Sequence, residues 1–126
     1  MTGTGNPRAR ILLSPEEGET VWLGGLGVRF MIDGTQTGET FALVEHPIEP
    51  RVLAAPIHTH QHEDEYTQVL EGEVGVQVGD EGRVARSRVA RSGDLVFKPR
   101  RVPHAFWNAG DAPARALESI SPEGFE

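Results

Sequence analysis

Glycine and proline interrupt this chain at short intervals, and their spacing limits the folds that it can adopt. The 126 residues include 15 glycines and nine prolines, and turn signals such as Asp33-Gly34, Gly79-Asp80 and Gly93-Asp94 recur along the chain. Short apolar or alternating stretches lie between these signals, and no helical periodicity is sustained. Roughly ten short strands separated by turns predict an all-β protein, either a sandwich or a barrel.

The length of the chain predicts a single domain with one hydrophobic core. Residues 1–10 contain glycine, threonine, asparagine and proline but no run of apolar residues. We expect these ten residues to form a flexible N-terminal arm. Residues 11–126 are then expected to form the barrel domain.

Charge and composition exclude several classes of partner. The formal net charge is −7, from 19 acidic and 12 basic residues, and this balance argues against a nucleic-acid partner, which needs a basic surface. The absence of cysteine excludes disulfides and thiolate ligands. No apolar run reaches the roughly 20 residues that a membrane span needs. The first ten residues also lack the apolar stretch of a signal peptide, so we expect a cytoplasmic protein with no membrane partner.

Basic residues are concentrated in one part of the chain. The simplest interpretation is a solvated outer strand face together with one loop. The alternative is an anion-binding rim or a subunit contact. Seven of the 12 basic residues fall in this stretch, namely Arg83, Arg86, Arg88, Arg91, Lys98, Arg100 and Arg101.

The side chains best suited to binding a metal lie in the run HTHQHEDE, from His58 to Glu65. Imidazole and carboxylate groups bind zinc, iron, nickel, copper and manganese. Residues i and i+2 of a strand point to the same face, so His58 and His60 can face one cavity. Glu65 is far enough along the chain to cross a short turn and return on the neighbouring strand.

A second segment carries another candidate ligand, His104. At strand spacing, His104 shares a face with Phe106 and Asn108, and Glu65 shares a face with Thr67. The neighbours of the candidate ligands on these faces are small or apolar, as expected inside a small barrel. The pattern therefore predicts a largely dry pocket.

The two segments resemble the two signature motifs of the cupin superfamily, in particular its small single-domain members of the cupin-2, quercetinase-like kind. The matched positions are His58, His60, Glu65 and Gly72 in H-x-H-x4-E-x6-G, and Gly93, Pro99, His104 and Asn108 in G-x5-P-x-G-x2-H-x3-N. Two glycines of the pattern are replaced, by Val52 and by Arg101. Neither is a ligand position, so these departures concern local turn geometry.

This resemblance implies a fold, a cofactor and an assembly. The fold is a double-stranded β-helix, or jelly-roll, in a single all-β domain. The cofactor is one divalent transition metal (Fe, Mn, Ni, Zn or Cu) bound by His58, His60, Glu65 and His104. The assembly is a homodimer, in which residues 1–13 could serve as an exchanged arm.

Two alternatives for the ligand set stay open. Glu63 and Asp64 compete with Glu65 for the carboxylate position, and the motif spacing favours Glu65. A shift of two residues would make His60 and His62 the ligands. Otherwise His62 is a solvated loop residue or a base at the mouth of the pocket.

Other residues are expected to support or line the site. Asn108 is expected to hydrogen-bond backbone groups nearby, and His46 to be structural or exposed. Each lining candidate is equally plausible as ordinary core. These candidates are Phe41, Thr67, Phe97, Phe106 and Asn108, with Trp22 and Met31.

The resemblance also implies a range of functions. We expect a metal-binding cupin that acts on a small organic molecule, as a dioxygenase-type oxidoreductase with a centre of three histidines and one glutamate. A metal-dependent isomerase or decarboxylase is the first alternative. The second is a module that binds a metal or small ligand without catalysis.

Overall fold

The computed structural model describes residues 12–38, 40–79 and 86–122. The predicted arm, residues 1–10, and Arg83 lie outside these ranges. The described elements are β1 (Thr20–Leu23), β2 (Leu26–Ile32), α1 (Gly34–Thr37), β3 (Ala42–Ile48), β4 (Leu53–His58), β5 (Asp64–Glu71), β6 (Glu73–Val78), β7 (Arg86–Arg91), β8 (Leu95–Lys98), β9 (His104–Asn108) and β10 (Ala114–Ser121).

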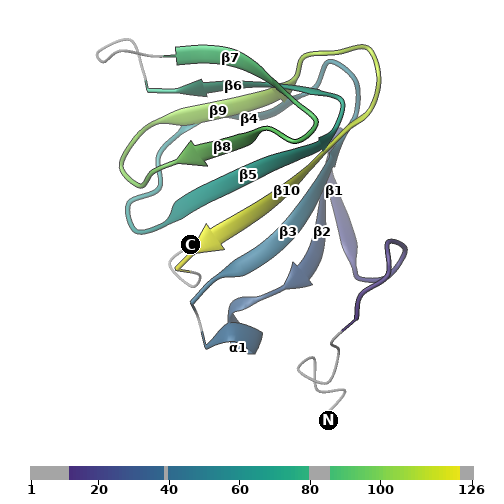
Figure 1. The fold of residues 1–126 in the computed structure, drawn as a ribbon, viewed down its shortest axis with the longest axis vertical. Coiled ribbons are helices and arrows are strands. Elements are labelled where there is room, and N and C mark those ends of the chain that lie inside the picture. The colour runs from purple at the N-terminus through teal and green to yellow at the C-terminus, as the bar shows by residue number, and fades with distance from the viewer. Residues whose placement is uncertain (1–11, 39, 80–85, 123–126) are drawn as a thin grey trace.

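The strands form two antiparallel sheets (Figure 1). One sheet has six strands in the order β1-β2-β3-β10-β5-β8, and the other has four in the order β4-β9-β6-β7. The last strand, β10, pairs with both β3 and β5, so segments far apart in the sequence lie side by side. The prediction of an all-β jelly-roll barrel is confirmed.

Apolar side chains fill the space between the sheets, and the strands alternate accordingly. In β10, Ala114 and Ala116 are completely buried whereas Arg115 is exposed. This period of two is expected for a strand with one face on the core. The buried cluster consists of Ile48, Val69, Val74, Val76, Ala90, Phe106 and Ala114.

The turn between β5 and β6 requires a glycine. Gly72 has a φ of 84°, in the left-handed region that side chains with a Cβ disfavour. A Cβ at this position would lie 2.9 Å from Cα of Ala114. The glycine of the first motif therefore allows a tight hairpin to pack against the start of β10.

A buried arginine fastens the segment before β1 to the outside of the six-stranded sheet. Arg29 is 8% exposed, and its Nη1 donates to Oε1 of Glu45 at 2.8 Å. Its other nitrogens donate to the backbone oxygens of Glu17, at 2.9 Å, and Ser14, at 2.7 Å. The guanidinium therefore supplies partners for two carbonyl groups and one carboxylate, which compensates for its burial.

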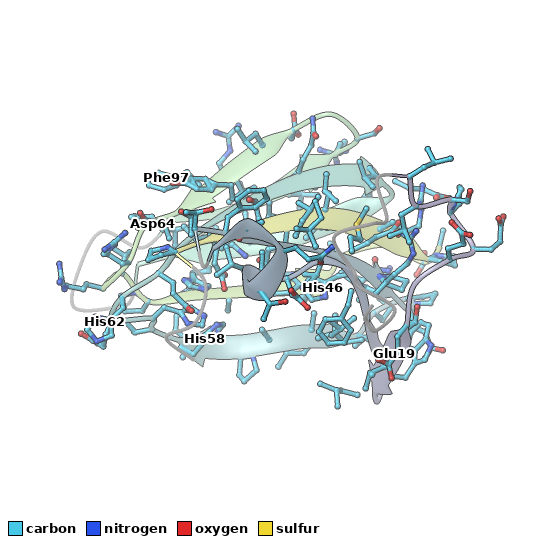
Figure 2. The ribbon with its side chains drawn as sticks, turned by 90° about the horizontal axis from the view of Figure 1, so that it is seen from below. Glu19, His46, His58, His62, Asp64 and Phe97 are labelled. Carbon is cyan, nitrogen blue, oxygen red and sulfur yellow. The ribbon has the colours of Figure 1, made fainter. Side chains whose placement is uncertain are left out.

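The single helical turn, α1, lies at one end of the barrel. Seen from that end, it stands in front of the space between the two sheets (Figure 2). Oδ1 of Asp33 accepts hydrogen bonds from the backbone nitrogens of Thr35, at 3.0 Å, and Gln36, at 3.2 Å, which caps the turn. Within the described residues, no helix has the length and apolar character needed to cross a membrane.

Candidate metal centre

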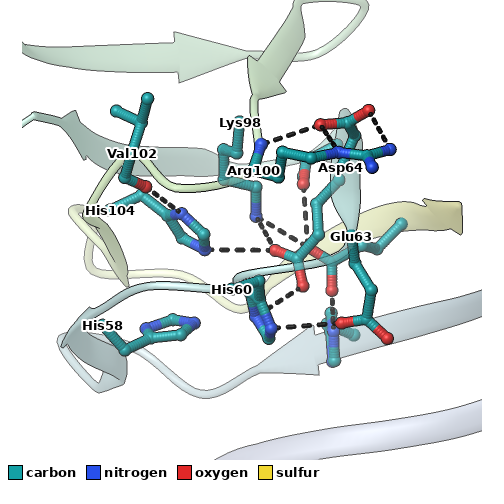
Figure 3. Close-up of polar contacts among 12 residues, drawn as sticks. His58, His60, Glu63, Asp64, Lys98, Arg100, Val102 and His104 are labelled. Atoms are coloured by element: carbon teal, nitrogen blue, oxygen red, sulfur yellow. Dashed lines mark hydrogen bonds and ion pairs between the residues drawn. The ribbon is translucent and has the colours of Figure 1, made fainter. Parts of the chain in front are cut away.

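Three histidines from two segments of the chain come together between the sheets. His58 ends β4, His60 follows two residues later, and His104 begins β9. Because β4 pairs with β9, His58 lies opposite His104. One ring nitrogen from each of the three lies within 4.8 Å of the others, and Figure 3 shows the three rings together. This group could hold a metal ion.

Backbone carbonyl groups fix the orientation of two of these rings. Nδ1 of His58 donates to the oxygen of Pro56 at 2.7 Å, and Nδ1 of His104 donates to the oxygen of Val102 at 3.2 Å. A carbonyl oxygen can only accept, so Nδ1 carries a proton in each ring. This leaves Nε2 as the nitrogen that can bind a metal, and the carbonyl groups hold it in place.

The ring of His60 lies between two carboxylates. Its Nδ1 is 3.1 Å from Oε1 of Glu63, and its Nε2 is 3.0 Å from Oε2 of Glu65. The third acid of the run, Asp64, instead accepts hydrogen bonds from Arg100, which hold the pKa of Asp64 below its ordinary value. The competing acids therefore occupy different places, and Glu65 is the one beside Nε2 of His60.

Glu65 also lies beside His104. Its Oε1 is 3.2 Å from Nε2 of His104 and 3.3 Å from Nζ of Lys98, and its side chain is 8% exposed. Burial raises the pKa of Glu65, but contact with His104 and the charge of Lys98 outweigh this effect, so the pKa lies below its ordinary value. Glu65 is therefore an ionised carboxylate that contacts two of the three rings.

These residues fit a divalent transition metal. Nε2 of His104 is buried and makes no hydrogen bond of good geometry with the described residues, although the Glu65 carboxylate is close. A buried polar atom without a partner is unfavourable, and coordination would satisfy it. Three imidazoles with a neighbouring carboxylate suit iron, manganese, nickel, zinc and copper.

A buried lysine behind the centre was not predicted from the sequence. Lys98 belongs to the basic stretch that we interpreted as a solvated face, but it is 1% exposed, so that interpretation is wrong for this residue. Its Nζ is 2.6 Å from Oε2 of Glu118 and 3.3 Å from Oε1 of Glu65. It also lies 4.8 Å from the centre of the Phe106 ring, over the ring face.

Glu118 connects Lys98 to two further buried side chains. Oε1 of Glu118 is 2.9 Å from Nε2 of His46, and its Oε2 accepts a hydrogen bond from Oγ1 of Thr67 at 3.1 Å. Nδ1 of His46 lies 2.9 Å from the backbone oxygen of Gly27. Both ring nitrogens of His46 thus face acceptors, an arrangement that favours the doubly protonated imidazolium.

The charges in this network shift the ionisation of its members. Burial alone would lower the pKa of His46, but its hydrogen bond to Glu118 and the charge of Glu118 raise the pKa above 6.5. Burial likewise opposes the charge on Lys98, yet Glu118 and Glu65 raise its pKa. Burial raises the pKa of Glu118, while Lys98 and His46 together lower it well below its ordinary value. Lys98 and Glu118 are therefore held in their charged forms, and contact with Glu118 favours the charged form of His46.

The signal that could have revealed this network lies in the strand period. In β10, the inward face carries Ala114, Ala116 and then Glu118, so a charge interrupts a small-residue face. A carboxylate on such a face requires a buried partner. The sequence does not show which cation supplies it, because the pairing of β8 with β5 brings Lys98 into position.

The predicted lining residues are distributed over different parts of the barrel. Thr67 and Phe106 are buried beside the network, whereas Phe97 is 52% exposed and stacks on Tyr66 with ring centres 5.2 Å apart. In the end view His46 lies centrally, while Phe97 and His62 lie at the periphery (Figure 2). His62 is exposed, and the gathered ring nitrogens belong to other histidines.

The remaining candidates lie away from the three rings. Asn108 is buried at the far end of β9, where its Nδ2 donates to the backbone oxygens of Ile48, Glu49 and Ala112. It therefore ties together loops instead of contacting the centre. Phe41 is half-buried just before β3. Of the other two candidates, Trp22 is 50% exposed and Met31 is half-buried.

Two cavities adjoin the interior. The first, of about 240 Å³, is lined by Val28, Phe30, Ile32, Asp33, Ala42, Val44, His46, Glu118 and Ile120. The second, of about 360 Å³, is lined by Val76, Val78, Arg88, Val89, Ala90, Asp94, Leu95, Val96 and Phe97. Ile120 is the register partner of Glu65, on the strand next to the one that carries this candidate ligand.

Two facing antiparallel sheets with histidines gathered between them define a β-barrel protein with a candidate metal centre. A family model described as "Cupin domain" matches residues 45–120, which is more than half of the chain. The chain therefore belongs to the cupin family. A search of curated proteins gave no match.

Solved structures share this fold. They include oxalate decarboxylase from Bacillus subtilis, with a TM-score of 0.76 and 22% identity over 90% of this chain. A predicted oxalate decarboxylase from Thermotoga maritima has a TM-score of 0.79 and 15% identity, covering 89% of this chain and 99% of that one. Iron(II) HppE has a TM-score of 0.73 and 19% identity, covering 88% and 60%. The chain spans only 30% of the Bacillus subtilis enzyme.

Proposed function

We propose that this protein is a metal-dependent enzyme that acts on a small organic molecule. The ion would be a single divalent transition metal held by His58, His60 and His104, with Glu65 as the fourth protein ligand. The convergence of three ring nitrogens within 4.8 Å of one another carries this proposal. When bound, such an ion polarises a substrate oxygen or lowers the pKa of a bound water.

The surrounding residues would orient the ligands and limit access of water. The carbonyl groups of Pro56 and Val102 fix two of the rings through Nδ1, and Glu63 fixes the third. Such outer partners hold each ligand nitrogen toward a common point. The barrel encloses this point, which strengthens electrostatic interactions with a substrate.

We further propose a dioxygenase-type oxidation as the reaction class. The cavity of about 240 Å³ is lined mainly by aliphatic and aromatic side chains, which suits a largely apolar molecule. Its lining includes Val28, Phe30 and Ile120, and Ile120 is the register partner of Glu65. Iron in the similar HppE structure supports iron as the ion to test first.

A metal-dependent decarboxylase or isomerase is the second candidate, and the names of two similar structures favour it. Oxalate is a small dianion. The titratable groups lining the cavity are Asp33, His46 and Glu118, of which two are acidic. Glu118 is paired with His46 and Lys98, and the rest of the lining is mainly apolar. A mainly apolar lining suits a more apolar substrate better than a dianion, so the oxidation of such a substrate is the stronger proposal.

The metal centre is tested by metal content. Purified wild-type protein is expected to contain about one equivalent of transition metal, and the His58→Ala/His60→Ala variant to have lost it. His62→Ala is the matched control, because its exposed ring lies outside the gathered group. Elemental mass spectrometry measures the metal content of the wild type and of both variants. Equal metal content in the wild type and the double variant would contradict the assignment, and loss in His62→Ala would favour the shifted ligand pair.

Turnover is tested by oxygen uptake with iron(II) or nickel(II) supplied. Flavonols, catechols and β-diketones form the panel, and release of carbon dioxide from oxalate tests the second candidate. Substrate-dependent oxygen uptake that His58→Ala/His60→Ala abolishes is the expected result. A protein that binds metal but turns over none of these compounds would be a binding module.

We propose a homodimer and a cytoplasmic location as well. Three adjacent residues of the edge strand β1 support the dimer, because Val21, Trp22 and Leu23 are 39%, 50% and 64% exposed. Exposed apolar side chains on an edge strand are unfavourable in a monomer. The absence of cysteine is compatible with a reducing compartment.

A further inference from the structure

Lys98 lies between two carboxylates in the interior of the barrel. Its Nζ is 2.6 Å from Oε2 of Glu118 and 3.3 Å from Oε1 of Glu65, and its side chain is 1% exposed (Figure 3). An ammonium group without access to water needs such partners to remain charged. Lys98 therefore cannot leave Glu65 without a large loss of electrostatic stabilisation.

The same carboxylate contacts the candidate ligand rings. Oε1 of Glu65 is 3.2 Å from Nε2 of His104, and its Oε2 is 3.0 Å from Nε2 of His60. Lys98 thus contacts the oxygen of Glu65 that faces His104. The carboxylate of Glu65 would therefore be attracted both by the ammonium group of Lys98 and by an ion bound to the histidines.

The charges form an alternating series that runs from His46 through Glu118 and Lys98 to Glu65. Each contact joins opposite charges, at 2.9, 2.6 and 3.3 Å. Each carboxylate of the series has a positive neighbour. The negative charge of Glu65 would therefore be shared between Lys98 and an ion bound by the histidines, although a glutamate taken alone would supply its whole charge to the ion.

We propose that Lys98 is a positioning residue of the metal centre, which holds Glu65 and shares its carboxylate with the ion. This inference rests on the proposed function, since it requires metal at the three histidines. The histidines bind the ion, and Lys98 reduces the share of the Glu65 charge that the ion receives. The affinity for metal is therefore lower than it would be if the glutamate contacted only the ion and no lysine.

Two variants that share one substitution test the proposal. Glu118→Gln removes the closest partner of Lys98, so the ammonium interacts more strongly with Glu65 and metal affinity should fall. Lys98→Met/Glu118→Gln removes one positive and one negative charge, keeps the buried charge balanced and releases Glu65 to the ion, so affinity should rise. Each change is expected to be about tenfold or more.

The measurement is the dissociation constant of nickel(II), determined by calorimetry on metal-free protein with His58→Ala/His60→Ala as the control. A merely structural role of Lys98 would move the affinity of both variants in the same direction, and that result would overturn the proposal. Unchanged affinity in both would also overturn it. Lys98→Arg, which retains the charge, should bind nickel(II) about as tightly as wild type.

The outcomes separate this inference from the proposed function. If wild type and His58→Ala/His60→Ala bind nickel(II) equally, the metal centre is wrong and the inference fails with it. If wild type binds nickel(II) and His58→Ala/His60→Ala does not, the metal centre stands. The inference alone then fails if the nickel(II) affinities of Glu118→Gln and Lys98→Met/Glu118→Gln do not change in opposite directions. Circular dichroism establishes that each variant is folded. If the double variant does not fold, Lys98→Gln/Glu118→Gln replaces it, with the same rise in affinity expected.

Discussion

Arg101 stands where the second cupin motif carries glycine, and it keeps the backbone conformation of a glycine. Its φ is 67°, in the left-handed region. Its backbone nitrogen donates to the oxygen of His60 at 2.6 Å, which links the loop before His104 to the segment that carries another candidate ligand. The link explains why this conformation is retained although a Cβ makes it unfavourable by roughly 1–2 kcal/mol.

Restoring the glycine should therefore stabilise the protein. Arg101→Gly removes the strain but adds conformational freedom to the unfolded chain, so we expect a net gain of about 0.5–1 kcal/mol in the free energy of unfolding. Urea unfolding of the metal-free wild type and variant measures this difference in the free energy of unfolding. Arg88→Gly, in strand β7, is the control and should be destabilising. A loss of stability in Arg101→Gly would contradict this prediction. It would show that the side chain of Arg101 stabilises the fold by more than the left-handed backbone conformation destabilises it.

Single residues also show what sequence spacing can and cannot reveal about the site. The gathering of His58, His60 and His104 was predictable because two local motifs present them at fixed spacing. Lys98 was not, because neither its residue type nor its neighbours Phe97 and Pro99 indicate that it is buried. Its environment depends on which strands lie beside β8, and that is a property of the assembled sheet.

At the scale of elements, the expectation of roughly ten short strands is confirmed by the described residues, but the order of the strands in the sheets was not predicted. The hairpin around Gly72 is local, and its two strands alternate as expected. By contrast, β10 lies between β3 and β5, so it brings Glu118 beside residues far away in the sequence. Periodicity shows which face of a strand is buried but does not identify the neighbouring strands.

The contact between β3 and β10 makes stability depend on pH. The pKa of His46 is raised above 6.5 in the folded protein, chiefly because Glu118 outweighs the effect of burial. The protonated ring therefore contributes its full stabilisation below pH 6.5, and this contribution is lost as pH rises through the folded-state pKa. We expect the free energy of unfolding of metal-free wild type to decrease over that range.

The control for this pH dependence is His46→Gln, which can keep a hydrogen bond to Glu118 but does not titrate. The difference in unfolding free energy between wild type and variant isolates His46 from the other histidines. That difference should be largest at about pH 6 and become smaller as pH increases. A difference that is independent of pH would mean that His46 does not change its protonation between the folded and unfolded states in this range.

For the whole molecule, the sharpest expectation concerns assembly. Sedimentation of wild type should give the mass of a dimer, and Trp22→Ser/Leu23→Ser should shift it toward the monomer, because these side chains on β1 are 50% and 64% exposed. Leu95→Ser is the control, because Leu95 is 69% exposed on β8 at the opposite edge of the same sheet. A monomeric wild type, or equal dissociation in both variants, would contradict the proposed dimer.

The attachment of Arg29 sets a limit on how far the polypeptide can be shortened for structural work. Two of its three acceptors are main-chain oxygens, at positions 14 and 17, so no side-chain replacement can substitute for that stretch. A truncated gene product that starts beyond residue 17 would leave guanidinium donors unsatisfied against Glu45. Deletion series should therefore stop before Ser14, and an affinity tag is best attached ahead of that point.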